Sequence, residues 1–122
     1  MLTAGRYLVE VLPRDAVLVT FFHSGSMRHH AGCSILRPDL VPPDSFDNVL
    51  ALLERRGYRP YLLLDDELER AGFLQRFAQT RIGALDWAPR ALIGSYGRLV
   101  LYDLADREPY LRGERWPIDV LP

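Results

Sequence analysis

The residues best suited to binding a ligand stand in one short segment, His23–Arg28 (HSGSMR). Its serines can begin a helix, and the free backbone N–H groups of a helix start, beside a glycine and an arginine, suit a phosphate or a sugar hydroxyl. The plainer alternative is that one serine caps the helix while the arginine pairs with a surface carboxylate. We take as candidate ligand-binding residues His23, Ser24, Gly25, Ser26 and Arg28.

This segment matches none of the common phosphate or nucleophile motifs. It lacks the Gly-Lys-Ser/Thr of a P-loop and the three spaced glycines of a dinucleotide fingerprint. The chain also contains no Gly-x-Ser-x-Gly nucleophile elbow. We therefore expect binding chemistry here, and we assign no catalytic residue.

Asp65 and Asp66 form a second candidate, directly after the apolar run Tyr61–Leu64. Two carboxylates at that position can bind a divalent cation or act as acid and base. The alternative is structural, because Asp66 with Glu69 three residues later resembles a capping box at a helix start. We expect Asp66 to be the cap, and we keep both aspartates as ligand-binding candidates beside the first segment.

The histidines give no metal prediction. His29 and His30 are adjacent, and adjacent side chains on a helix point about 100° apart, so they rarely share one ion. No carboxylate stands at a recognised ligand spacing from them. We expect neither a metal nor a cofactor. The Asp86-Trp87 pair before Pro89 remains open between a sugar pocket and a turn anchored by a buried indole.

Predicted strands and helices alternate along the chain around these candidate residues. Apolar runs at 16–22, 33–37 and 59–64 are typical of strands, and the first, bounded by turn residues, is typical of a strand buried on both faces. Helical patterns occupy 4–12, 24–31 and the segment from Asp44, as its cap, to Gly57, and another follows Asp66. The first candidate segment then lies at the carboxyl end of a strand, where open α/β sheets bind ligands.

This alternation predicts the fold class. It indicates a three-layer α/β fold with a mainly parallel sheet of about five strands. Short apolar runs at 90–94 and 98–103, joined by Ser95-Tyr96-Gly97, predict a closing antiparallel hairpin. We expect one domain over 1–122, with an N-terminal helix in 1–13 and an irregular tail in 104–122.

Composition narrows the class of partner. The chain has 122 residues and a formal net charge of −1, and its basic residues are interleaved with acidic ones, so nucleic acid is not an expected partner. The single Cys33 excludes an internal disulfide. No run has the length and apolarity of a membrane span, and the first residues lack a signal-peptide pattern. We expect the chain as given to be soluble.

Four segments carry a resemblance to a known family: HSGSMRHHAGCSILRPD, LLERRGYRPYLLLDDELE, FLQRF and DW-P. They resemble the soluble C-terminal domain of bacterial membrane glycosyltransferases of the GT-C class, the group of dolichyl-phosphate-mannose–protein mannosyltransferases and aminoarabinose transferases. In that family a membrane part binds a polyprenyl-phosphate sugar, and its catalytic carboxylates lie in an early extracytoplasmic loop. The soluble domain lies over that site on the outer, periplasmic face of the inner membrane.

The resemblance implies a non-catalytic domain that covers the membrane active site or engages the acceptor. Its partners would be the membrane portion of the same polypeptide or complex and, as ligand, the polyprenyl-phosphate sugar or the acceptor. The chain alone would not transfer sugar. Two other classes stay open: a small stand-alone α/β enzyme or binding protein for a phosphate-bearing ligand, and an interaction module without a small ligand.

Overall fold

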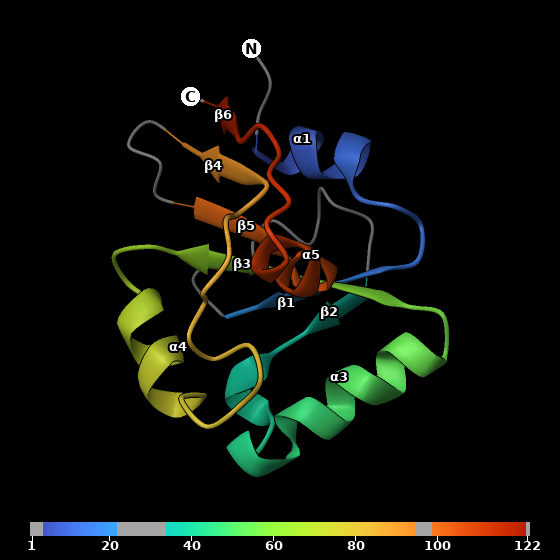
Figure 1. Cartoon of the computed structure of the whole chain (residues 1–122), viewed down its shortest axis with the longest axis vertical. Helices are drawn as coiled ribbons and strands as arrows, with labels where there is room; N and C mark the ends of the chain where they lie inside the picture. Colours follow the sequence, from blue (N-terminus) through green and yellow to red (C-terminus); the bar gives the residue numbers. More distant parts are fainter. Residues whose placement is uncertain (1–3, 22–33, 95–98, 122) are drawn as a thin grey trace.

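The computed structural model describes residues 4–21, 34–94 and 99–121, and it is an α/β structure built on one six-stranded sheet (Figure 1). The helices and strands in chain order are α1 (Ala4–Val11), β1 (Ala16–Thr20), β2 (Ser34–Leu36), α3 (Phe46–Arg55), β3 (Arg59–Asp65), α4 (Arg70–Arg76), β4 (Ala91–Ile93), β5 (Leu99–Asp103), α5 (Arg107–Leu111) and β6 (Asp119–Leu121). Short 3₁₀ turns occur at Pro38–Leu40, Pro43–Ser45 and Leu104–Asp106.

The sheet has the strand order β2-β1-β3-β5-β4-β6. β1 is parallel to β2 and β3, β4 is parallel to β6, and β5 is antiparallel to both of its neighbours. β5 therefore runs against the other five strands. The predicted α/β class and the mostly parallel sheet are confirmed, and so is the antiparallel β4–β5 pair. The segment joining that pair, 95–98, lies outside the described residues.

β1 is an interior strand, as its composition predicts. All five of its residues are buried, because helices cover both faces of the sheet. On one face α3 packs through Phe46 and Leu50 against sheet residues that include Leu62. α4 packs there through Phe73, and so does Phe77, the residue directly after α4. On the other face α1 packs through Tyr7 and Leu8 on a second cluster. These clusters give the helix–sheet–helix layering visible in Figure 1.

The start of α3 differs from the prediction. Asp44 does not cap the helix, because it lies inside the 3₁₀ turn Pro43–Ser45, and Ser45 occupies the N-cap position without a side-chain hydrogen bond. The fixed φ of Pro43 suits the first position of such a turn, which moves the helix start past Asp44. The predicted end is confirmed: Gly57 has φ +87°, a conformation that glycine adopts without strain.

The expectation of an irregular tail in 104–122 was wrong. This segment contains a 3₁₀ turn, α5 and the sixth strand, β6. α5 has five residues and β6 has three, too few to show a hydrophobic period in the sequence. β6 exists because β4 offers it a parallel pairing partner. Among the described helices, none is long and apolar enough to cross a bilayer.

Candidate functional site

Two edges of the sheet can present polar groups. The carboxyl ends of β1 and β3 lie at one edge, since Thr20 pairs with Leu63 in parallel register. β1 has β2 on one side and β3 on the other, which is a topological switch point of the kind that binds ligands in open α/β sheets. The candidate residues His23, Ser24, Gly25, Ser26 and Arg28 all lie outside the described residues, so their role stays a prediction. Asp65 and Asp66 can be placed.

Asp65 is a capping residue. Its Oδ1 accepts hydrogen bonds from the backbone N–H groups of Glu67 (3.0 Å) and Leu68 (2.9 Å). In return, Glu69 Oε1 accepts from the backbone N–H of Asp65 at 2.9 Å. Both carboxylates are buried. This reciprocal pair does the work of a capping box, one residue earlier than the sequence predicts.

Asp66 was therefore wrongly predicted as the cap. The last residue of β3 is Asp65, whose side chain turns back onto the following N–H groups, so Asp66 is left on the surface. There it forms an ion pair with Arg70 at 3.5 Å, four residues later. The capping explanation accounts for Asp65, and an ordinary surface pair accounts for Asp66.

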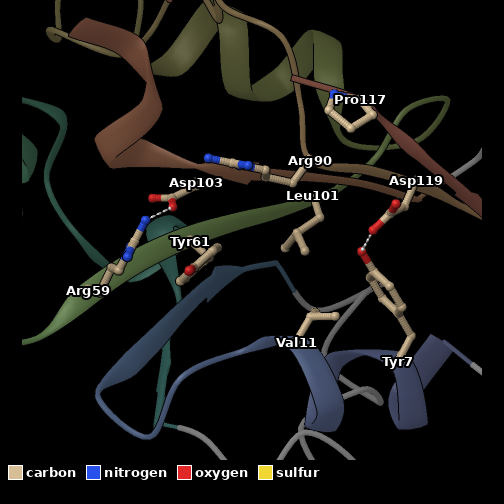
Figure 2. Close-up of a pocket in the computed structure, with 9 residues that line it drawn as sticks. All are labelled: Tyr7, Val11, Arg59, Tyr61, Arg90, Leu101, Asp103, Pro117 and Asp119. Carbon is tan, nitrogen blue, oxygen red and sulfur yellow. Dashed lines mark hydrogen bonds and ion pairs between the residues drawn. The ribbon is translucent and has the colours of Figure 1, made fainter. Parts of the chain in front are cut away.

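The opposite edge of the sheet, called the amino edge because β1 and β3 begin there, contains a cavity that the sequence did not indicate. Its volume is about 410 Å³, within the range of roughly 300–1,000 Å³ typical of small-molecule sites. β5 runs against its neighbours, so its carboxyl end meets the beginnings of β3 and β6 at this edge, and α1 covers one side (Figure 2). The lining residues are Tyr7, Val11, Arg59, Tyr61, Arg90, Leu101, Asp103, Pro117 and Asp119.

One end of the cavity holds Arg59 on Asp103. The Arg59 guanidinium donates to Asp103 Oδ2, and Asp103 Oδ1 accepts from the backbone N–H of Ala105 at 3.0 Å. The Asp103 side chain is 2% exposed, while that of Arg59 is 46% exposed. Trp87 Nε1 donates to the Asp103 backbone oxygen at 3.1 Å. The buried carboxylate therefore holds the guanidinium in place and leaves its other side open.

Arg90 repeats this arrangement. Its Nε and Nη2 donate to the two oxygens of Asp106 at 2.6 and 2.8 Å, and its guanidinium carbon lies 4.7 Å from the Trp116 ring centroid. The Asp106 side chain is 6% exposed and that of Arg90 is 41% exposed. These hydrogen bonds to carboxylates raise the pKa values of Arg90 and of Arg59 further above their ordinary range. Both arginines are charged at every accessible pH.

The other end of the cavity presents an acceptor. The Tyr7 hydroxyl donates to Asp119 Oδ2 at 2.7 Å, and Figure 2 shows this pair apart from the arginines, with Leu101 and Val11 between them. Burial, and then the bond to Asp119, raise the pKa of Tyr7 well above its ordinary value. Burial, followed by the charge of Asp103, raises the pKa of Tyr61 to about 12. Both phenols are protonated near neutral pH.

The residues that line this cavity can bind and orient a small ligand. They do not include a nucleophile paired with a base. Guanidinium donors lie at one end, an apolar floor in the middle and a carboxylate with a phenol at the other end. Within residues 4–21, 34–94 and 99–121, no cluster of three or more His, Cys, Asp or Glu side chains can hold a metal ion. Trp87 is buried and supports the cavity from behind, so the buried-indole alternative describes it.

Sequence reasoning missed this cavity because its polar residues are far apart in the chain. Arg59 and Asp103 are 44 positions apart, and Tyr7 and Asp119 are 112 positions apart. The signal available in the sequence was that Arg59 is the first residue of an apolar strand and Arg90 directly precedes another. That signal becomes useful only once the strand order is known. Comparison with protein-family models, with curated proteins and with solved structures gives no match for the chain.

Proposed function

We propose that this α/β domain is the soluble, non-catalytic part of a lipid-linked-sugar membrane glycosyltransferase, on the periplasmic face of the inner membrane. Its role there is to cover the membrane active site or to engage the acceptor. The proposal starts from the resemblance of the four sequence segments. Its partners are the membrane portion of the enzyme and, as ligand, the polyprenyl-phosphate sugar or the acceptor.

The observation that carries the proposal is where the resembling segments lie in the fold. LLERRGYRPYLLLDDELE runs from the end of α3 through β3 to the cap before α4, and FLQRF lies at the end of α4. DW-P contributes the buried Trp87, which belongs to the same core as Phe73 and Phe77. These three segments are thus parts of one folded unit, which supports treating the resemblance as that of a domain. Most of the first segment, HSGSMRHHAGCSILRPD, lies outside the described residues.

The polar groups that the structure describes at the carboxyl edge also support a non-catalytic role. Asp65 and Glu69 cap the turn before α4, and Asp66 is paired on the surface. Such groups stabilise the domain and do not carry bond-making chemistry. In this proposal the catalytic carboxylates belong to the membrane portion.

The coding sequence upstream of Met1 tests the proposal most directly. An in-frame continuation into several apolar segments of about 20 residues each is expected, since that length spans a bilayer. A stop codon in frame immediately upstream, with the chain made as a separate protein, would overturn the proposal. In that case the alternative of a stand-alone binding protein for a phosphate-bearing ligand applies.

A functional test uses the full-length enzyme. Arg28→Ala should lower sugar transfer in membranes, because Arg28 is the cation of the predicted anion-binding segment. The thermal unfolding of the soluble domain should be unchanged. Normal turnover by this variant removes the segment His23–Arg28 from the proposed site, and loss of the folded domain shows that Arg28 is structural.

A further inference from the structure

The cavity between α1 and the amino edge of the sheet supports a second proposal, which does not depend on the proposed function. All of its lining residues are described, and the cavity exists whether or not a membrane portion adjoins this chain. The question is what chemistry the exposed groups select.

At the arginine end a ligand meets donors and not acceptors. Asp103 and Asp106 are almost completely buried, and their oxygens face the guanidiniums and the Ala105 N–H. Among the described residues, no acceptor is bonded to Nε and Nη1 of Arg59 or to Nη1 of Arg90. These N–H groups belong to guanidiniums that are close to half exposed. They are therefore available to an anion from the cavity.

Two guanidiniums favour a phosphate over a single carboxylate. They come from different strands, one at the start of β3 and one just before β4, and both line the same cavity beside Tyr61 (Figure 2). A phosphate has enough oxygens to accept from two planar guanidinium groups at once. Each arginine is already held by an aspartate, so little side-chain entropy is lost when the anion binds.

The far end of the cavity selects for hydroxyl groups on the same ligand. Asp119 is exposed, and it already accepts from Tyr7. A carboxylate has further lone pairs, so Asp119 can accept from a ligand hydroxyl as well. Leu101, Val11 and the Tyr61 ring lie between the two ends and suit the apolar face of a ring.

We propose that this cavity is a binding site for a small phosphate ester that carries hydroxyl groups. The phosphate lies on Arg59 and Arg90, the hydroxyl-bearing part lies over Leu101 and Tyr61, and Asp119 accepts from a hydroxyl at the far end. The ester can be free or can be the headgroup of a lipid, because the groups recognised are the same.

Isothermal titration of the chain with glucose 1-phosphate, inorganic phosphate and glucose tests the site. Glucose 1-phosphate should bind saturably, inorganic phosphate about tenfold more weakly and glucose not measurably, since the charge-assisted bonds contribute most of the affinity. A glucosyl phosphodiester with a short prenyl chain separates the sources. Tighter binding of this diester assigns a lipid headgroup, and preference for the monoester assigns a free ligand.

Three variants locate the binding. Arg59→Lys keeps a positive charge next to Asp103 but loses the planar fork, so it should weaken glucose 1-phosphate and inorganic phosphate alike, by about tenfold. Asp119→Asn should weaken only glucose 1-phosphate, by a few-fold. Arg107→Lys is the matched control, because Arg107 is paired with Asp86 at 2.9 Å and does not line this cavity. It should bind like the original chain.

Two results would overturn the site. One is no saturable binding of glucose 1-phosphate by the folded chain at millimolar concentration, and the other is binding that Arg59→Lys and Arg107→Lys weaken equally. If Arg59→Lys unfolds the chain, chemical-shift changes at the Tyr7 and Tyr61 rings of the original protein decide, and unmoved signals reject the proposal. None of these outcomes bears on the upstream coding sequence, so the two proposals fail separately.

Discussion

The two edges of the sheet use the same residue types in opposite ways. At the carboxyl edge Asp65 and Glu69 bond to backbone groups within four positions of themselves. At the amino edge Arg59, Arg90 and Tyr7 bond to carboxylates 44, 16 and 112 positions away. The first set closes the turn before α4, and the second set joins β3, β5, β6 and α1 around a cavity.

The two edges also differ in how many polar groups remain for a ligand. Local capping holds Asp65 Oδ1 on two backbone N–H groups, and the burial of Asp65 leaves little for a ligand to contact. An arginine held by a distant buried aspartate keeps donors on its open side. Among the described residues, the amino edge is therefore the stronger candidate for a ligand-binding site, even though open α/β sheets more often bind ligands at the carboxyl edge.

The largest expected effect on stability comes from Arg59→Met. It leaves Asp103 buried without its guanidinium, and an unpaired buried charge costs about 2–3 kcal/mol of unfolding free energy. Urea unfolding measures this loss. Arg107→Met is the control, since it removes an exposed pair worth less than about 1 kcal/mol. Equal losses in the two variants would mean that Asp103 does not depend on Arg59.

Alkaline pH should also weaken the amino edge. The pKa of Tyr61 is raised from 10.0 to about 12 by burial and then by Asp103, so the unfolded chain loses this proton first as pH rises. The contribution of Tyr61 to the free energy of unfolding is fully present below pH 10. It falls by about 2 kcal/mol as the pH rises towards 12. Urea unfolding across that range measures it, and Tyr61→Phe should make the decline shallower, leaving the part that comes from Tyr7, whose pKa is also raised. An equally steep decline in Tyr61→Phe would assign it to other groups.

The carboxyl edge should respond more weakly, through its cap. Asp65→Ala removes the acceptor of two backbone N–H groups, which costs about 1–2 kcal/mol. Asp65→Asn, which keeps an acceptor oxygen, should recover part of this loss. Thermal unfolding measures both variants. Binding of glucose 1-phosphate at the amino edge should be the same in both, and a parallel loss of binding would show that the two edges are coupled.

The smallest effect is expected at Asp66. Its ion pair with Arg70 is solvent-exposed, and the two charged atoms are 3.5 Å apart. Such pairs contribute less than about 0.5 kcal/mol to the free energy of unfolding. Asp66→Asn should therefore shift the thermal midpoint by an amount close to the error of the measurement. A loss as large as that of Asp65→Ala would return Asp66 to the capping role that the sequence predicted.

Much of the fold was predictable because it depends on local patterns. The buried run at 16–20, the helix ending at Gly57 and the apolar run Tyr61–Leu64 each show a period or a turn signal over a few residues. The errors fell where elements were too short to show one, as in α5 and β6. The cap moved from Asp66 to Asp65 because strand β3 continues one residue further than its apolar run.

Hydrophobic period and turn residues were enough to predict the alternation of strands and helices, the interior place of β1 and the antiparallel β4–β5 pair. Only the folded chain shows that β5 lies next to β3, which brings Asp103 to Arg59. Only the folded chain shows, too, that β6 pairs with β4, which brings Asp119 to Tyr7. Non-local strand pairing leaves no periodic trace in the chain, because it depends on the summed packing of both sheet faces. The cavity could not be predicted from the sequence, because it is formed by these non-local pairings.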